Sequence, residues 1–350
     1  MRTKLPGNIK GKSDRYLAAA KKWGSSADTP KTMRAVAVDR FGPPSALVLR
    51  ELPVPRPGPR EVLIAIHTAG VGSWDASIRD GSWRKPGRPR FPLVPGIDGA
   101  GLIVAKGSRV RGFRVGDRVY AYEFGNRQGG FYAEFAAVDA GHVGRVPTGL
   151  SLREAGAAVT TALTALQSIN ALRLRPRETV LIFGASGAVG TLAVQFAVHR
   201  GAHVVATASG APATRLVRRL GADRVIDARE EASAELLRTL APDGLDGVLA
   251  LAGGDELERC LDFVRPRGRV VHPNGVEPPP RQRRTFRVRS FDAVASPREF
   301  AKLTRHIRSH GVRVPIAAVY PLAQAARAHR RMDREQVIGR MALKVRRSPD

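Results

Sequence analysis

The stretch Val180-Leu-Ile-Phe-Gly-Ala-Ser-Gly-Ala-Val-Gly190 decides the fold of this 350-residue chain. Its first four residues are apolar and predict a buried strand, the glycines predict a tight turn, and the apolar run Thr191–Ala197 predicts a helix. Small residues allow a backbone to approach a pyrophosphate closely, and free N–H groups at a helix start attract its negative charge. This order of elements therefore predicts a dinucleotide site, although a tight turn in an unrelated α/β protein is the alternative. The residues expected at the phosphates are Ser186, Gly187, Ala188, Val189 and Gly190.

Short apolar strands alternate with longer helical segments from about residue 178 onward. The expected strands are Val180–Phe183, Val204–Thr207, Val225–Ile226, Val248–Leu251 and Val270–Val271. The expected helices are Ala188–Arg200, Thr214–Leu220, Glu231–Leu240 and Glu256–Phe263. Such alternation is typical of repeated βαβ units, so this half is predicted to be an α/β domain with a doubly wound parallel sheet and helices on both faces.

The half that precedes residue 150 shows a different pattern, with short strands and no expected helices between them. Its expected strands are Arg34–Val38, Ala46–Glu51, Val62–Ile66 and Val119–Tyr122. The connections are rich in proline and glycine, as in Pro53-Val-Pro-Arg-Pro-Gly-Pro59, and these residues interrupt helices and so disfavour long ones. We therefore expect an all-β, barrel-like domain here.

Charge is the one unusual feature of the composition. The chain carries 58 Lys and Arg against 31 Asp and Glu, a formal net charge of +27, and residues 1–32 alone carry eight Lys or Arg against two Asp. We interpret residues 1–32 as a flexible basic arm. A positive field of this size attracts polyanions, so binding of nucleic acid through the basic surface is one hypothesis. A compositional preference for arginine along the whole chain explains the charge equally well.

Metal sites find little support in the sequence. The single cysteine, Cys260, excludes an intrachain disulfide and any site with two thiolates. His306 and His310 have helical i, i+4 spacing, but no acidic residue stands between them, and we expect a solvated helix face. No apolar run is long enough for a membrane span and the N-terminus lacks the core of a secretion signal, so we expect a cytoplasmic protein without membrane contact.

The second expected strand of the parallel sheet ends in Ala206-Thr-Ala-Ser-Gly210. Enzymes that use NAD usually place a carboxylate at this point, on the ribose hydroxyls, and this chain has none before Asp223. Ser209, with Arg215, Arg218 or Arg219 close behind, offers hydrogen-bond donors for a 2′-phosphate. The pattern favours NADPH over NADH, with Arg215 as the expected partner, although each arginine alone is also compatible with a solvated helix face.

Several further motifs resemble one known family from Met33 to about Arg346. They are Ala69-Gly-Val-Gly-Ser-Trp-Asp75, Pro95-Gly-Ile-Asp-Gly-Ala-Gly101, Gly112-Phe-Arg-Val-Gly-Asp-Arg-Val119, Gly130-Phe-Tyr-Ala-Glu-Phe135, Leu163-Thr-Ala165 and the ending Ala325–His329 through Ile338-Gly-Arg340. With the glycine turn, they make the chain similar to the quinone oxidoreductase, or zeta-crystallin-like, branch of the medium-chain dehydrogenases/reductases.

This resemblance implies a division into four parts. A GroES-like β-barrel substrate domain is expected at residues 33–155 and a Rossmann NADP-binding domain at 156–310. Residues 311–350 are expected to return to the substrate domain, after the arm at 1–32. The resemblance also places Arg340 at the cofactor and implies a homodimer.

Zinc-using relatives carry a cysteine where this chain has Gly72 and a His-Glu pair where it has Ile97-Asp98, and their four-cysteine lobe is absent. The resemblance therefore implies an enzyme without zinc. Close quinone oxidoreductases have Asn-Pro where this chain has Gly72-Ser73, so Ser73 is the candidate to replace the missing amide. Asp75 and Asp98 are expected in turn or cap bonding.

The chemistry that the resemblance implies is hydride transfer from NADPH to a quinone or an α,β-unsaturated carbonyl compound. Such acceptors need mainly positioning, exclusion of water and a hydrogen-bond donor. The candidate catalytic residues are Ser73, Tyr122 and Thr164, the last as a ligand of the carboxamide, and Trp74 and Phe131 are candidates to line the acceptor pocket. For the aromatic residues a core position is the alternative. Two other functions stay open, a nucleic-acid-binding protein on a reductase fold and a zinc-free alcohol or carbonyl reductase.

Overall fold

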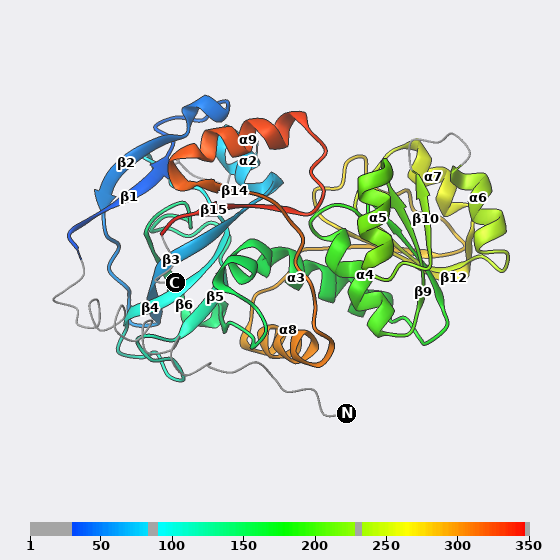
Figure 1. Cartoon of the computed structure of the whole chain (residues 1–350), viewed down its shortest axis with the longest axis horizontal. Coiled ribbons are helices and arrows are strands. Elements are labelled where there is room, and N and C mark those ends of the chain that lie inside the picture. The colour runs from blue at the N-terminus through cyan, green and yellow to red at the C-terminus, as the bar shows by residue number, and fades with distance from the viewer. Residues whose placement is uncertain (1–29, 83–89, 228–232, 347–350) are drawn as a thin grey trace, which may run out of the picture.

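The structure is a computed structural model that describes residues 30–82, 90–227 and 233–346. The expected basic arm at residues 1–32 therefore lies, apart from its last three residues, outside the described part of the chain. Two sheets, each with its own hydrophobic core, occupy opposite ends of the molecule in Figure 1.

A six-stranded sheet forms the half that contains the glycine turn. Its strands, in spatial order, are β10 (Arg224–Asp227), β9 (His203–Ala208), β8 (Thr179–Phe183), β11 (Leu245–Ala250), β12 (Val264–Pro273) and β13 (Arg287–Phe291), and every neighbouring pair is parallel. Counted from β8, this is the order 3-2-1-4-5-6 of a doubly wound dinucleotide-binding fold. The α/β fold expected from the alternating pattern is confirmed.

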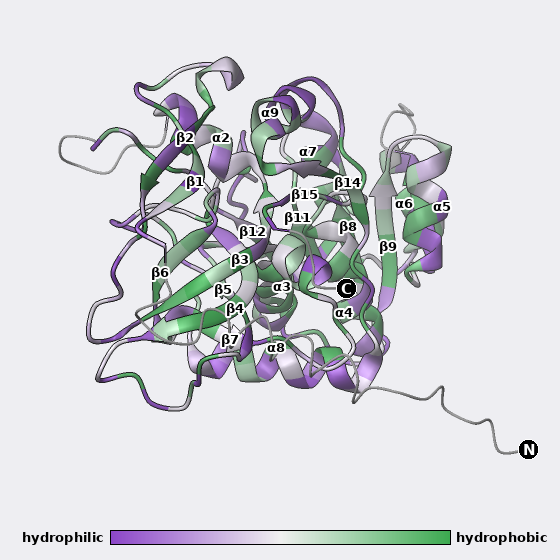
Figure 2. Ribbon diagram, turned by 60° about the vertical axis from the view of Figure 1, so that its left-hand side comes forward, coloured by the Kyte–Doolittle hydropathy of each residue, from purple (hydrophilic) through white to green (hydrophobic). Residues whose placement is uncertain are grey.

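Helices cover both faces of this sheet because its strands are apolar on both sides. Val180 and Ile182 belong to one buried cluster and Leu181 and Phe183 to another, as the two-residue period of a strand requires. The first cluster packs against α3 (Leu152–Leu172), α4 (Gly190–His199), α5 (Ala211–Arg219) and α8 (Pro297–His310), and the second against α6 (Ser233–Leu240) and α7 (Asp255–Leu261). In Figure 2, the exposed helix α5 carries both hydrophilic and hydrophobic residues, as an amphipathic helix does.

A seven-stranded sheet forms the other half. Its order is β14 (Ile316–Pro321), β15 (Arg340–Lys344), β3 (Glu61–Val71), β4 (Asp98–Lys106), β5 (Arg118–Tyr122) and β7 (Val143–Arg145), while β6 (Phe135–Asp139) also pairs with β3. A separate hairpin joins β1 (Thr32–Ala37) to β2 (Val48–Pro53). The chain therefore returns to the seven-stranded sheet after it has built the six-stranded one, because β15 pairs with β3.

Several elements differ from the sequence prediction. Ala46 belongs to the short 3-10 helix Pro44–Ala46 and not to a strand, and α2 (Ser73–Asp80) is a helix within the part before residue 150 that was expected to be all-β. Helix α9 (Ala325–Arg334), in the returning C-terminal segment, packs on the same half. The expected boundary between residues 155 and 156 falls inside α3, whose residues contribute to the core beneath both sheets. The four-part division stays a prediction. Among the described residues, no helix is both long and apolar enough to cross a membrane.

A buried network ties α9 to α2 and to the barrel. The Arg79 guanidinium donates to Nδ1 of His329 at 3.1 Å, so the ring proton is on Nε2, which donates to the Tyr132 hydroxyl at 3.0 Å. Both His329 and Tyr132 are 0% exposed. Burial, with the adjacent charge of Arg79, lowers the pKa of His329 to about 3.

This network predicts a loss of stability in mild acid. The unfolded chain binds a proton at residue 329 below pH 6.5, whereas the folded chain does so only near pH 3, so folding is favoured less as the pH falls through 6.5. Between pH 7 and pH 5 this histidine should remove about 2 kcal/mol of unfolding free energy. Denaturant unfolding of the wild type and of His329→Gln at both pH values measures this contribution of His329 to the free energy of unfolding. The same pH slope in both proteins would contradict it.

Candidate functional site

A cavity of about 670 Å³ lies where the two halves meet. Its walls come from α2, β5, α3, the glycine turn, the segments that follow β11 and β12, and the segment that leads into β15. The predicted site residues among its lining are Ser73, Trp74, Tyr122, Thr164, Gly187, Ala188, Val189, Gly190 and Arg340. Residues that the sequence assigned to cofactor and to acceptor therefore share one cavity.

The glycine turn is held rigidly by the neighbouring strand β9. The Thr207 hydroxyl accepts from the Gly184 amide at 2.8 Å, and the Thr207 carbonyl accepts from the Ala185 amide at 3.0 Å. A Cβ at Gly190 would lie 2.5 Å from the Gly184 carbonyl oxygen, so only glycine allows α4 to start this close to β8. At Gly187 a Cβ would meet only one atom, at 3.5 Å, which leaves that side of the turn open to the cavity.

The returning C-terminal segment closes the other side of the turn. The Gly339 amide donates to the Ser186 carbonyl at 2.9 Å, and Gly187 and Gly339 form a parallel bridge. Gly339 has φ +83° and packs against the Pro315 carbonyl, a position that a side chain would obstruct. Ser186 is accordingly 2% exposed and is not among the lining residues. Its carbonyl bonds to the returning segment and does not face the cavity.

Arg340 and Asp98 form a buried ion pair at the cavity wall. One Arg340 nitrogen lies 3.1 Å and 3.3 Å from the two Asp98 oxygens, and Nε donates to the Ala157 carbonyl at 2.9 Å. Asp98 also accepts from the Thr160 amide at 3.1 Å. The pair therefore joins β15, β4 and α3. Asp98 was expected only to bond within a turn, but here it connects three elements.

The ion pair explains why two neighbouring positions are glycine. A Cβ at Gly70 would lie 2.3 Å from an Asp98 oxygen and 2.6 Å from an Arg340 nitrogen, and one at Gly72 would lie 2.4 Å from the other terminal nitrogen of Arg340. The guanidinium thus fills the space that a side chain at position 72 would need. A side chain at position 72, such as the asparagine of the family, would have to displace this guanidinium.

Asp75 fulfils the cap role that the sequence predicted. Its carboxylate accepts from the amide of the N-cap residue Gly72 at 2.8 Å, at the start of α2, and from the Ile97 amide at 3.1 Å. Burial, reinforced by the nearby Asp98, raises the pKa of Asp75 to about 7. Its oxygens accept from two backbone amides and interact with the Tyr132 hydroxyl, and it does not line the cavity.

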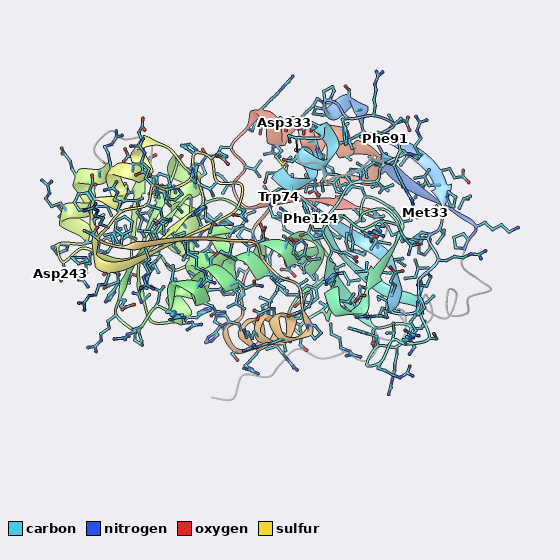
Figure 3. All side chains as sticks on the ribbon, turned by 180° about the vertical axis from the view of Figure 1, so that it is seen from behind. Met33, Trp74, Phe91, Phe124, Asp243 and Asp333 are labelled. Atoms are coloured by element: carbon cyan, nitrogen blue, oxygen red, sulfur yellow. The ribbon has the colours of Figure 1, made fainter. Side chains whose placement is uncertain are left out.

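An aromatic wall bounds the acceptor side of the cavity. The rings of Trp74 and Phe124 meet edge to face with centroids 5.5 Å apart, and Figure 3 shows both side chains close together on the barrel half. The indole also reaches the other half, because a Cβ at Gly275 would lie 3.4 Å from its Cζ2 atom. Trp74 therefore spans from α2 to the segment that follows β12, and Phe124 is an aromatic lining residue that the sequence prediction missed.

Hydroxyl groups line two sides of the cavity. Ser73 is exposed at the first position of α2, and Tyr122 is half-buried at the end of β5. Burial, with smaller effects of Asp292 and Asp98, raises the pKa of Tyr122 to about 12, so its hydroxyl keeps its proton at neutral pH. Both side chains can donate a hydrogen bond.

Helix α3 contributes threonines at positions 160, 161 and 164. The Thr164 hydroxyl donates to the Thr160 carbonyl at 2.9 Å, which leaves its lone pairs free to accept. The Thr160 hydroxyl is buried and has no partner among the described residues. Thr160 was missed by the sequence prediction, although its i, i+4 spacing from Thr164 places the two on one helix face.

Four predicted site residues lie outside the cavity: Ser186, described above, and Phe131, Ser209 and Arg215. Phe131 is 0% exposed and packs against Gly96 and Gly99, so it is a core residue and does not line the acceptor pocket. Ser209 is half-buried at the end of β9, and Arg215 is exposed on α5. Within the described chain, no carboxylate forms an ion pair with Arg215.

The donors at the cavity fit a dinucleotide and not a zinc ion. An open glycine turn at a helix start and an unpartnered Thr160 hydroxyl suit a phosphate and an amide ligand. Among the described lining residues there is no cysteine or histidine, and the sole carboxylate is that of Asp292. Asp98, next to the position of the family's zinc ligands, is already paired with Arg340.

Comparison with known proteins supports the assignment of both halves. Residues 58–148 match the alcohol dehydrogenase GroES-like domain, and residues 220–343 match the zinc-binding dehydrogenase family. The quinone oxidoreductase of Mus musculus is 32% identical over 314 residues, which cover 85% of this chain and 93% of the mouse protein.

Solved structures agree with this relationship over almost the whole chain. A mycobacterial protein complexed with NADPH is 28% identical with a TM-score of 0.78, over 89% of this chain and 100% of that one. An NAD-dependent alcohol dehydrogenase is 29% identical with a TM-score of 0.83, over 90% and 100% of the two chains. With its 3-2-1-4-5-6 sheet, its glycine turn and its returning C-terminal segment, the chain belongs to the medium-chain dehydrogenase/reductase superfamily of NAD(P)-dependent oxidoreductases.

Proposed function

We propose that this oxidoreductase uses NADPH to reduce quinones or α,β-unsaturated carbonyl compounds without a catalytic zinc ion. The observation that carries the proposal is a cavity with the open glycine turn on one side and the Trp74–Phe124 wall on the other, with no metal-binding donor set among its described lining residues. The similarity to a quinone oxidoreductase and to a protein complexed with NADPH agrees with it.

The residues of the cofactor side have complementary tasks. The amides from Gly187 to Gly190 would face the diphosphate at the start of α4. The Thr164 hydroxyl would accept from the carboxamide N–H₂, because its own proton is engaged by the Thr160 carbonyl. Ser209 and Arg215 would take the 2′-phosphate at the end of β9. When bound, the nicotinamide supplies the hydride equivalent.

The residues of the acceptor side position a flat, conjugated compound. Trp74 and Phe124 would stack against it and exclude water. Tyr122 or Ser73 would donate to the oxygen on which negative charge develops, and the raised pKa of Tyr122 keeps it a donor over the neutral range. Conjugated acceptors are activated by their own structure, so these tasks suffice in the absence of a Lewis acid.

Removal of metal should leave the reaction rate unchanged. Protein dialysed against excess EDTA should oxidise NADPH with a quinone or an enone at the same initial rate as untreated protein, because the described lining residues include no cysteine or histidine. A rate that EDTA abolishes and Zn²⁺ restores would favour an alcohol dehydrogenase mechanism, and a screen with simple alcohols would then identify the substrate class.

The 2′-phosphate contact predicts a selective effect of Arg215→Ala. The KM for NADPH should rise by about tenfold, as expected for loss of one partly solvated charged hydrogen bond, while the KM for NADH stays unchanged. Arg219→Ala is the matched control, since it removes an arginine from the same helix about 6 Å farther along the axis. If the wild type prefers NADH, the assignment of Arg215 to a 2′-phosphate is overturned. Asp227, whose carboxylate accepts from the Gly210 amide at 3.0 Å, would then be the candidate partner of the ribose hydroxyls.

The donor role of Tyr122 predicts a defect in kcat. Tyr122→Phe should lower kcat by roughly 100-fold, the lower end of the effect of losing one oxyanion donor, with little change in the KM for NADPH. Tyr320→Phe removes a hydroxyl far from the cavity and should have no effect. If Tyr122→Phe keeps full kcat and Ser73→Ala loses it, the donor is Ser73.

A further inference from the structure

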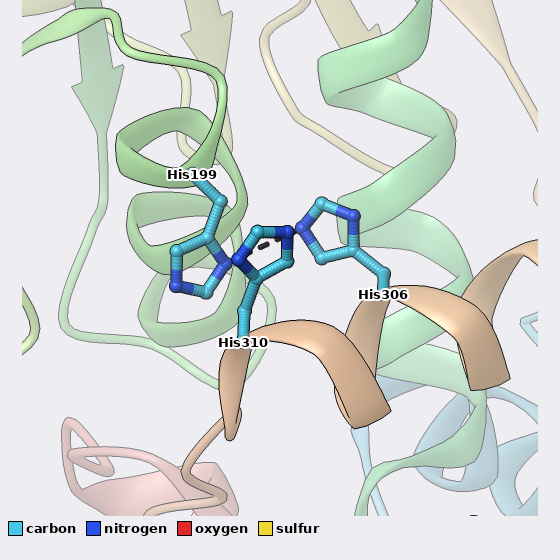
Figure 4. A group of neighbouring side chains, drawn as sticks. All are labelled: His199, His306 and His310. Carbon is cyan, nitrogen blue, oxygen red and sulfur yellow. Dashed lines mark hydrogen bonds between the residues drawn. The ribbon is translucent and has the colours of Figure 1, made fainter.

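Three histidines from two helices converge on the side of the parallel-sheet half. His199 is the last residue of α4, and His306 and His310 lie in the last turns of α8. Figure 4 shows the three rings turned toward one another across the gap between the helices. One ring nitrogen from each lies within 4.8 Å of those of the other two, and no other such group occurs among the described residues. We call these residues the histidine cluster.

The distances in the cluster suit a single metal ion. Nδ1 of His199 and Nε2 of His306 are 3.3 Å apart. Two imidazole nitrogens that bind one zinc ion at 2.0–2.1 Å with a tetrahedral angle are also about 3.3 Å apart. His310 stacks on His199 with ring centroids 4.2 Å apart and is exposed, so its ring can turn to bring a third nitrogen to the same point.

The surroundings orient His306 and disfavour the charged form of two of the three histidines, His199 and His306. The buried Phe196 ring packs edge to face on His306 at 4.8 Å between centroids and fixes its orientation. Burial, with the charges of His310, His199 and Arg200, lowers the pKa of His306 to about 4, and burial with His310 lowers that of His199. Neutral imidazole is the form that binds a metal, so protons compete little at neutral pH.

The local electrostatics also favour a cation despite the basic surface. The cluster lies at the C-terminal ends of both α4 and α8, where the helix dipoles place partial negative charge. The Arg200 guanidinium, whose charge acts on His306, donates to the Asn170 side chain and is thereby engaged outside the cluster.

We propose that His199, His306 and His310 form a binding site for a divalent transition-metal ion of the zinc type, with solvent at the fourth position. Such an ion would cross-link the end of α4, whose other end forms the glycine turn, to α8. Its role would be structural, because none of the three histidines lines the catalytic cavity. Imidazole ligands suit Zn²⁺, Ni²⁺ and Cu²⁺ better than Mg²⁺ or Ca²⁺.

Zinc titration of the purified full chain tests the site. The protein must carry no polyhistidine tag and must first be stripped with EDTA. The wild type should bind one Zn²⁺ per chain in competition with a chromophoric chelator, and Co²⁺ should give the visible absorption of a four-coordinate site. His310→Ala, an exposed substitution, should weaken Zn²⁺ binding by at least about tenfold. Binding of NADPH should be the same for both proteins.

The matched control is His203→Ala, which removes the histidine at i+4 from His199. This residue is exposed on β9, beyond the end of α4, and is not part of the cluster. The control should bind Zn²⁺ like the wild type. Saturating Zn²⁺ should also raise the melting temperature of the wild type and of His203→Ala, and not that of His310→Ala. Absence of stoichiometric Zn²⁺ binding to the wild type, or equal loss in both variants, would overturn the proposal and leave the cluster as a packed set of neutral rings.

Discussion

The buried ion pair between Arg340 and Asp98 is the constraint on which the rest of the site depends. Arg340 is 7% exposed and Asp98 0%. Two charges removed from water at this depth are tolerated only when they are paired and their remaining hydrogen-bonding groups are used, and here the Ala157 carbonyl and the Thr160 amide complete the set. Loss of one partner leaves a bare charge in the core, a change that typically costs about 3–5 kcal/mol. The pair thus fixes the C-terminal segment, the barrel and α3 in one arrangement.

This arrangement also determines the shape of the cofactor site. Arg340 follows Gly339 directly, and the Gly339 amide is bonded to the Ser186 carbonyl in the glycine turn. A shift of the ion pair would therefore move the turn, although Arg340 and Ser186 are far apart in the sequence. The turn has a second support in Thr207, which belongs to the parallel sheet. Contacts from both halves thus hold the wall against which the diphosphate is proposed to lie.

The parts that local sequence determines were predictable, and the parts that long-range packing determines were not. The strand, the turn and the start of α4 follow from a glycine pattern within eleven residues, and the role of Asp75 follows from its place at a helix start. Phe131 could not be assigned, because an aromatic residue beside a motif is compatible with a pocket or a core, and the space left by Gly96 and Gly99 decides for the core. Helix α3 was not predicted, although the capping box of Ser151 and Glu154 at its start is a sequence signal that could have found it. The histidine cluster needs His199 beside His306, two residues joined only by the packing of α4 on α8.

The guanidinium at the cavity wall has a chemical consequence for the class of substrate. Relatives that use zinc place a cysteine at position 72, but here the Arg340 guanidinium occupies the space of that side chain and its partner Asp98 is no longer a free ligand. Because Asp98 neutralises the Arg340 guanidinium, this wall offers no net positive charge that could withdraw electrons from an alkoxide or a carbonyl oxygen as a Lewis acid would. The cavity wall can still hold and orient the cofactor and the substrate. This agrees with the proposed acceptors, whose own conjugation lowers the barrier to hydride addition, and with a proposed donor such as the Tyr122 hydroxyl, which burial keeps protonated.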